Sequence, residues 1–274
     1  MTKKSKAGTR EWADSNVNIQ TGCEHNCKYC YAKCMALRFG RTTIAGWASP
    51  KPNQRVINKG FKKRRGRIMF PSSHDITPEN LYECSVVLLN MLDAGNEVLI
   101  VSKPHIECVT NLSSILKEYK RQIVFRFTIG SAQNEVLEFW EPNAPCFEER
   151  LDCLAYAYEQ GYQTSVSCEP MLDDNISAVV HAVSPHTTGS IWIGKANRLR
   201  QIMSLNCPGD EEVKARADEL IFMQNDDHLV HLIAVYDSFP KIQWKDSIKE
   251  VWSRNEEEIF QHPAWVDEED RLPF

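Results

Sequence analysis

The chain has 274 residues, of which 42% are hydrophobic and 25% are charged, and its formal net charge is −5 at pH 7. This composition is ordinary for a globular protein, and ten cysteines are too few for a small disulfide scaffold. No run approaches the roughly 18 apolar residues of a membrane span, and no apolar stretch of a secretory signal follows the basic N-terminus. The sequence therefore predicts a protein of the reducing cytoplasm, with no membrane partner.

Short β-rich runs alternate with helical patterns along the chain. One helix is predicted to begin at Thr77, with Pro78 in its first turn, and to end at Gly95. Further helices are predicted at 106–119 and 147–160. Strands are predicted at 17–20, 67–70, 98–101, 123–129, 164–168 and 190–193. This alternation predicts an α/β fold, namely a partial (β/α)6 TIM-type barrel with parallel strands.

The same pattern suggests how the chain is divided. We expect residues 1–205 to form the barrel and residues 206–274 to form a helical C-terminal extension packed on it. No linker rich in Gly, Ser or Pro separates the two parts. Residues 41–66 have a weak secondary-structure signal, and we expect a long basic insertion there, of the kind that is often functional.

Three closely spaced cysteines carry most of the chemical information. Cys23, Cys27 and Cys30 have the spacing C-x3-C-x2-C. Three thiolates on one loop can hold three corners of a 4Fe-4S cluster and leave the fourth iron open to a small molecule. Cys34 can instead supply a fourth ligand and close an iron–sulfur or zinc site. If a helix starts at Cys30, Cys34 lies one turn further along it and can point away from the cluster.

Charge is distributed unevenly along the chain. Residues 25–74 contain twelve Lys or Arg and no Asp or Glu, whereas residues 200–274 contain seventeen acids and eight bases. The densest basic run can bind the phosphates of DNA or RNA in a salt-dependent way, or it can be a solvated loop. Its charged members are Lys62, Lys63, Arg64, Arg65 and Arg67.

Polar residues follow most of the predicted strands, and the strand predicted at 123–129 itself carries two of them. In parallel barrels the carboxyl ends of the strands meet at one edge, where ligands bind, so these residues are expected to lie around one site. They are Ser72, Ser73, His74, Asp75, Lys103, His105, Arg126, Thr128, Ser131, Glu169, Lys195, Asn197 and Arg198.

The cysteine spacing, with Tyr29 directly before the third cysteine, resembles the radical S-adenosylmethionine (SAM) superfamily. The longer string from Cys27 to Ala32 resembles the spore photoproduct lyase-like branch and its phage-associated relatives. Segments that extend this resemblance over roughly residues 16–200 are 70–75, 141–151 and 167–170.

The resemblance implies two cofactors, a 4Fe-4S cluster and SAM. It implies that Cys23, Cys27 and Cys30 ligate the cluster and that an aromatic side chain packs near the adenine of SAM. Ser72 and Ser73 stand where the family contacts the SAM amino group. Residues expected to bind the cofactor are Tyr29, Ser72, Ser73, Arg126, Thr128, Ser131, Glu169 and Lys195. Glu169 can alternatively be a buried carboxylate paired with Arg126 or Lys195.

The implied activity is reductive cleavage of SAM, driven by an external electron donor of the flavodoxin or ferredoxin type, followed by hydrogen abstraction from a substrate. A nucleic acid or nucleotide is the favoured substrate, in repair or base modification of lyase or transferase type. Cys168 is a candidate donor of a hydrogen atom to the product radical. The alternative is a non-catalytic, metal-stabilised nucleic-acid-binding protein with a closed zinc or iron–sulfur site.

Overall fold

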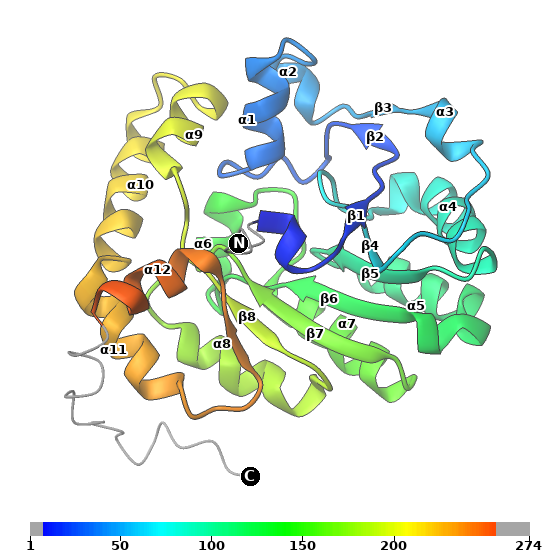
Figure 1. The fold of residues 1–274 in the computed structure, drawn as a ribbon. Helices are drawn as coiled ribbons and strands as arrows, with labels where there is room; N and C mark the ends of the chain where they lie inside the picture. Colours follow the sequence, from blue (N-terminus) through cyan, green and yellow to red (C-terminus); the bar gives the residue numbers. More distant parts are fainter. Residues whose placement is uncertain (1–7, 256–274) are drawn as a thin grey trace, which may run out of the picture.

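The computed structural model describes residues 8–255, which form an α/β fold around one open sheet (Figure 1). All seven strands of this sheet are parallel, and β1 and β9 form its edges without pairing with each other in the described part of the chain. The predicted partial barrel is therefore confirmed, with one strand more than expected. In spatial order the strands are β1 (Ser15–Asn16), β4 (Arg67–Phe70), β5 (Glu97–Ser102), β6 (Ile123–Thr128), β7 (Gln163–Cys168), β8 (Ile191–Ile193) and β9 (Ile242–Trp244).

One face of the sheet is covered by helices. The continuous apolar runs of the central strands place residues such as Ile100 and Phe125, which pair in register, in the core beneath these helices. Gly95 and Gly161 end two of the helices with φ near +77° and +76°, where glycine is favoured. The covering helices are α4 (Leu81–Asp93), α5 (Ile106–Ile115), α7 (Phe147–Glu159) and α8 (Ile176–Val183).

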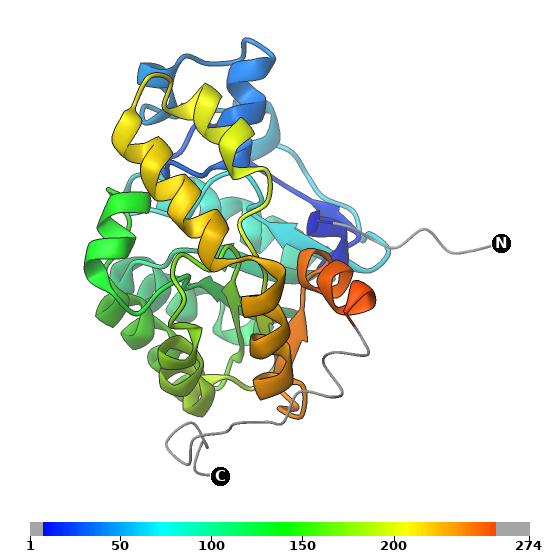
Figure 2. The ribbon, with the colours of Figure 1, turned by 90° about the vertical axis from the view of Figure 1, so that its left-hand side faces the viewer.

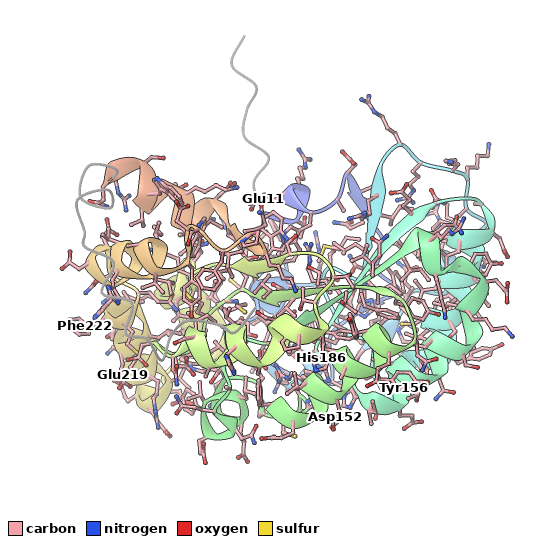
Figure 3. The ribbon with its side chains drawn as sticks, turned by 90° about the horizontal axis from the view of Figure 1, so that it is seen from below. Glu11, Asp152, Tyr156, His186, Glu219 and Phe222 are labelled. Atoms are coloured by element: carbon pink, nitrogen blue, oxygen red, sulfur yellow. The ribbon has the colours of Figure 1, made fainter. Side chains whose placement is uncertain are left out.

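The opposite, concave face is partly covered by the N-terminal segment. Figure 3 shows Glu11 on one side of the sheet, and Asp152 and Tyr156 of α7 on the other. Glu11 ends a short 3-10 turn, η1 (Gly8–Glu11). Directly after it, Trp12 and Ala13 pack against inward-facing strand residues, which are Met69, Leu99, Val101 and Val124.

The first strand differs from the prediction of residues 17–20. Only β1 (Ser15–Asn16) joins the sheet, while β2 (Gln20–Thr21) pairs antiparallel with β3 (Lys51–Pro52) in a separate ribbon. After Val17, whose N–H still donates to the carbonyl of Met69, the chain leaves the sheet, and the N–H of Ile19 donates to the ring of His74. Residues 41–66, where an insertion was expected, contain β3 and two short helices, α2 (Ile44–Trp47) and α3 (Gln54–Ile57).

The C-terminal region also contributes to the sheet. It contains β9, a strand of three residues that was not predicted and that lies between α11 and α12 in the chain. The helices of this region are α9 (Leu199–Asn206), α10 (Glu211–Met223), α11 (Asp226–Tyr236) and α12 (Asp246–Arg254). Figure 2 shows α9 and α10 beside α1 (Tyr31–Arg38), against which α9 packs. The acidic tail 256–274 of the predicted extension lies outside the described residues. Within residues 8–255, no helix combines the length and apolar character needed to cross a bilayer.

Candidate functional site

The cysteine loop, residues 22–30, lies at the carboxyl edge of the sheet and is closely fitted to its neighbours. Gly22 has φ of +111°, and a Cβ there would lie 2.7 Å from the carbonyl oxygen of Trp47. The next N–H, that of Cys23, donates to the same oxygen at 3.0 Å. Only glycine allows this approach, so the start of the loop is fixed by α2.

The rest of the loop is held by residues distant in sequence. The N–H of Lys28 donates to the carbonyl of Trp140 at 2.8 Å, at the end of α6 (Asn134–Trp140). The side-chain amide of Asn206, on α9, donates to the carbonyls of Lys28 and Cys30 at 2.8 and 2.9 Å. Asn206 was not predicted, because a single asparagine some 176 residues away gives no local signal of such a contact.

The three cysteines of the motif differ in exposure. Cys23 and Cys27 are buried, while Cys30 is partly exposed and caps α1, its sulfur accepting from the N–H of Lys33 at 3.4 Å. Cys34 lies one turn further along α1 and packs in a different apolar cluster, formed mainly by α6, α9 and α10. The side chain of Cys34 is thus committed to packing between helices, which favours the loop of three cysteines over a closed set of four.

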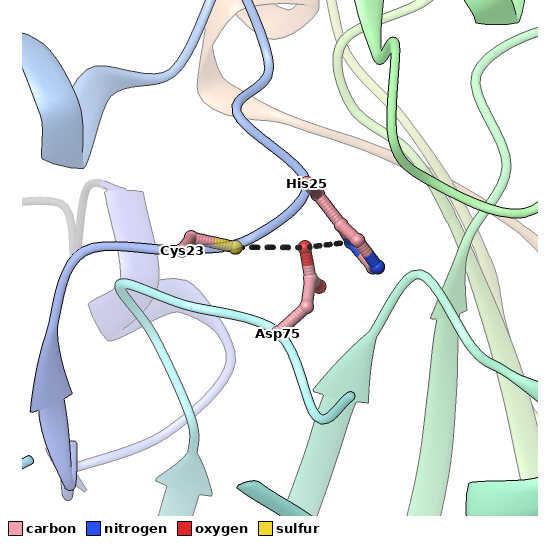
Figure 4. A group of neighbouring side chains, drawn as sticks. All are labelled: Cys23, His25 and Asp75. Carbon is pink, nitrogen blue, oxygen red and sulfur yellow. Dashed lines mark hydrogen bonds and ion pairs between the residues drawn. The ribbon is translucent and has the colours of Figure 1, made fainter. Parts of the chain in front are cut away.

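Asp75, in the loop after β4, links the cysteine loop to the sheet (Figure 4). One of its oxygens lies 2.9 Å from Nδ1 of His25 and 3.8 Å from the sulfur of Cys23. The same oxygen accepts from the ammonium of Lys103 at 3.1 Å, and the other accepts from the backbone N–H of Lys103 at 2.8 Å. His25 in turn lies 2.8 Å from His105 through their Nε2 atoms.

Cys23, His25 and Asp75 offer ligand atoms within 4.8 Å of one another, and among the described residues they are the group that could hold a single metal ion. The Lys103 ammonium already pairs with the carboxylate of Asp75, which a metal ion in this group would need as a ligand. A divalent ion there would meet a fixed positive charge, so the geometry does not favour a mononuclear metal site.

Electrostatics at the loop are dominated by burial and by Lys103. Burial raises the pKa of the thiols of Cys23, Cys27 and Cys30, and the Lys103 ammonium acts in the opposite direction. Burial alone would raise the pKa of Asp75, but Lys103 and His25 hold it well below its usual range. The free thiols are therefore protonated, and binding of a metal must release protons.

Tyr29, within the loop, is fixed by a buried ion pair. Its hydroxyl donates to Glu141, and Glu141 pairs with Arg150 at 2.5 Å with both side chains fully buried. Arg150 also donates to the carbonyl of Pro145 at 2.8 Å and to that of Thr128 at 3.2 Å. The segment 141–151 singled out in the sequence thus contains the pair that anchors the aromatic residue of the motif.

On the concave face, Arg126 lies between two indoles. Its guanidinium is 4.7 Å from the ring of Trp12 and 5.3 Å from that of Trp192, and its Nε donates to Ser165 at 3.0 Å. Burial, with a further contribution from Arg67, lowers its pKa to about 9.

Glu169 forms an ion pair with a lysine that the sequence did not indicate, and its side chain is 24% exposed. The carboxylate lies 3.3 Å from the ammonium of Lys245, which also contacts Glu11 at 2.6 Å. The predicted partners, Arg126 and Lys195, are replaced because β9 ends beside β8 and brings Lys245 to this face. Burial raises the pKa of Glu169, and Lys245 opposes this rise.

The predicted serines lie in two different loops. The backbone N–H groups of Ser72 and Ser73 both donate to the side-chain oxygen of Asn18, at 2.7 and 3.0 Å, in the loop after β4. Ser131 is fully buried and its hydroxyl donates to Asp173. Ser131 is therefore engaged between two loops at the carboxyl edge, on the side of α6 and α8.

Thr128 and Lys195 complete the predicted set. Thr128 ends β6 and shares the inward-facing register of Arg126, because alternate residues of a strand point to one face. Lys195 follows β8, and its N–H donates to Ser247 at 3.3 Å. The concave face thus brings together Arg126, Thr128 and Glu169, with Lys245 as an unpredicted fourth member.

Cys168 lies on the face of the sheet opposite to that of Arg126. It is fully buried in the core beneath the helices, with Val166 and Ile193, whereas Ser165 contacts Arg126 on the concave face. Because residues 165 and 168 differ by an odd number of positions along β7, they point to opposite faces. This placement does not favour the hydrogen-donor role predicted for Cys168.

The basic run lies at the amino edge of the sheet, away from the cysteines. Asn96, just before β5, accepts from the N–H of Arg64 at 2.7 Å and donates to the carbonyl of Lys62 at 3.3 Å. The four residues of β4 separate this edge from the loop of Asp75 by about 13 Å. The basic run therefore does not flank the cysteine loop. Its charged members are Lys62, Lys63, Arg64, Arg65 and Arg67.

Comparison by sequence finds uncharacterized relatives. No protein-family model matches the chain. An uncharacterized protein of Acidianus two-tailed virus is 30% identical over 176 residues, which cover 60% of this chain and 57% of that protein. An uncharacterized protein of Methanocaldococcus jannaschii is 25% identical over 175 residues, which cover 62% of this chain and 66% of that protein. The matched region thus spans less than two thirds of either relative.

Comparison by structure identifies the fold. Spore photoproduct lyase, in a variant with bound AdoMet and dinucleoside spore photoproduct, matches 82% of this chain and 74% of its own, with a TM-score of 0.51 and 14% identity. A cysteine-to-serine variant of the same enzyme matches 89% and 79%, with a TM-score of 0.52 and 13% identity. SuiB of Streptococcus suis, bound to S-adenosylmethionine, matches 84% and 49%, with a TM-score of 0.50 and 10% identity.

Both enzymes are radical SAM enzymes. This chain therefore has the fold of radical SAM enzymes, and the resemblance predicted from its cysteines is confirmed at the level of the fold. Spore photoproduct lyase is the enzyme after which the predicted branch is named.

Proposed function

We propose that this protein is a radical SAM enzyme that uses a 4Fe-4S cluster held by Cys23, Cys27 and Cys30. The observation that carries the proposal is the arrangement of the thiols. Three lie on one anchored loop at the carboxyl edge of an open parallel sheet, and the nearest further cysteine, Cys34, packs between helices. Three ligands on such a loop leave one iron of the cluster without a protein ligand.

The surrounding residues suit a cluster of this charge. Lys103 provides a buried positive charge that acts on all three thiols and would offset the negative charge of a thiolate-bound cluster. Tyr29, Asn206 and Trp140 hold the loop by hydrogen bonds, so its shape does not have to be ordered by the metal. When bound, the cluster and SAM would together supply reductive cleavage of SAM and hydrogen abstraction from the substrate.

SAM would lie between the cysteine loop and the concave face. Thr128 and Glu169 are polar groups of that face near the carboxyl edge, and Ser72 and Ser73 belong to the loop beside the cysteines. We assign the contacts to SAM to these four residues. Tyr29 would limit access of water to the cluster, because its ring is fixed against Trp140 at 6.5 Å between centroids.

For the substrate we propose a nucleic acid or nucleotide. The structural relative with AdoMet also holds a dinucleoside spore photoproduct, a ligand that contains two nucleosides. The acid-free stretch 25–74 supports binding of phosphates, and a long nucleic acid could contact both edges of the sheet. Neutralising Lys62, Lys63, Arg64 and Arg65 would then weaken binding and flatten its salt dependence, without altering SAM cleavage.

Anaerobic reconstitution tests the enzyme assignment. We expect about four irons per chain and formation of 5′-deoxyadenosine from SAM when dithionite is the reductant. Cys30→Ala should lose the iron and the activity, whereas the matched variant Cys34→Ala should keep both. Zinc content without SAM cleavage, or loss of the metal in Cys34→Ala, would support the closed-site, non-catalytic alternative instead.

A further inference from the structure

Helix α1 presents an apolar stripe to solvent. Tyr31 is 57% exposed and Phe39, at its C-cap, is 56% exposed, with Met35 partly exposed between them. Residues 31, 35 and 39 are four apart, so they lie along one side of the helix. The other side of α1 is buried through Lys33, Cys34 and Ala36. A surface helix normally buries its apolar side, so this exposed stripe suggests contact with a partner.

Arginines accompany the stripe. The guanidinium groups of Arg38 and Arg41 lie 5.9 and 5.3 Å from the ring centroid of Phe39. Ile44, at the start of α2, is a further exposed apolar residue close in sequence, with 43% of its surface accessible. We call this surface the α1 patch; its residues are Tyr31, Met35, Arg38, Phe39, Arg41 and Ile44. No acidic residue occurs between positions 25 and 74, so the segment that forms the patch is only positively charged.

The patch begins at the cysteine loop. Cys30 caps α1 and is partly exposed, and Tyr31 is the next residue. With a rise of 1.5 Å per residue, Phe39 lies about 12 Å further along the helix. The patch therefore begins at the residue that follows the most exposed of the three thiols.

We propose that the α1 patch docks an acidic one-electron carrier protein that reduces the cluster. This inference rests on the proposed function. One electron passes from the reduced flavin or iron–sulfur group of the carrier to the cluster, so that the carrier is oxidised by one electron and the cluster is reduced by one. No atom is transferred.

The composition of the patch fits a protein partner better than a nucleic acid. Tyr, Phe, Met and Arg are the residues enriched at protein interfaces, where Lys is depleted, and the patch contains no lysine. Electron-transfer partners bind through small interfaces, so a docking surface centred on these six residues suits such a partner. Two arginines beside an apolar centre would steer an acidic partner and increase its rate of association.

The experiment compares two reductants on the reconstituted protein. One is dithionite, which is too small to need a docking surface, and the other is an enzymatically reduced flavodoxin with an acidic surface. The variant is Arg38→Glu/Arg41→Glu, and the matched control is Lys117→Glu/Arg121→Glu, the same charge change on exposed residues before β6 at the opposite edge. Stopped-flow oxidation of the flavodoxin and its Kd for the protein are measured at several salt concentrations.

We expect the patch variant to lose about tenfold or more in the rate constant with flavodoxin and to lose the salt dependence of that rate. Its 5′-deoxyadenosine formation with dithionite should equal that of the wild type, and the control should behave as wild type with both reductants. Equal effects of the two variants, or a patch variant that loses DNA or RNA binding but keeps its rate with flavodoxin, would overturn the proposal. A wild type that cleaves no SAM with dithionite would instead refute the proposed function.

Discussion

Replacing Arg150 by Met isolates the energetics of the pair that anchors the cysteine loop. Arg150 and Glu141 are 2.5 Å apart, and both side chains are fully buried. Methionine fills a similar volume without charge, so the variant leaves the Glu141 carboxylate buried without its cation. Burial would lower the pKa of Arg150, but Glu141 raises it above its usual value, which is the sign of a strong pairing.

The magnitude follows from the burial of the pair. Removing one partner of a buried ion pair costs about 3–5 kcal/mol, because the remaining charge keeps its desolvation penalty. The pair between Arg200 and Asp218 is a control at 2.6 Å, but its side chains are 72% and 46% exposed. Water screens this pair, so Arg200→Met should cost no more than about 1 kcal/mol.

Urea unfolding of the metal-free protein, followed by circular dichroism, measures both values. We also expect Glu141→Gln combined with Arg150→Met to lose less stability than the sum of the two single variants, because no charge is left buried. The reasoning is refuted if Arg150→Met costs as little as Arg200→Met, or if the two single losses simply add.

Three further predictions concern the same edge of the sheet. Lys103→Met removes the buried ammonium that pairs with Asp75 and should cost about 3–5 kcal/mol in the free energy of unfolding. Burial lowers the pKa of His74, so the folded state favours the neutral ring. The stability that His74 contributes is therefore full above about pH 6.5 and is lost as the pH falls below this value. His74→Gln should flatten the decline in the free energy of unfolding between about pH 7 and pH 5, as measured by urea titrations. Gly130→Ala places a Cβ 2.5 Å from the backbone oxygen of Pro170 and should cost about 1–3 kcal/mol.

Each of these predictions has a matched control. Lys117→Met removes an exposed lysine, and His181→Gln removes an exposed histidine of α8. Gly60→Ala adds a methyl group where nothing lies within 4 Å. If a control changes stability as much as its partner variant, or if His74→Gln keeps the wild-type slope with pH, the corresponding argument fails.

Local features were determined by the sequence alone. The apolar runs at 98–101 and 123–129 became β5 and β6, because residues buried on both faces need no alternation. The helix expected after Thr77 is 3-10 at first and then α4, which ends before Gly95 as expected. The cysteine spacing is also local, and the fold similarity agrees with the family that it suggested.

The faces and partners of individual side chains were decided only by the tertiary structure. Residues 164–168 are all buried, so no hydrophobic pattern could tell which of them, Cys168 included, face the helices. The charge pairs join positions far apart in sequence, such as Asp75 with Lys103 and Glu169 with Lys245. Strand register and the order β7-β8-β9 bring these groups together, and neither is encoded in any short stretch of residues.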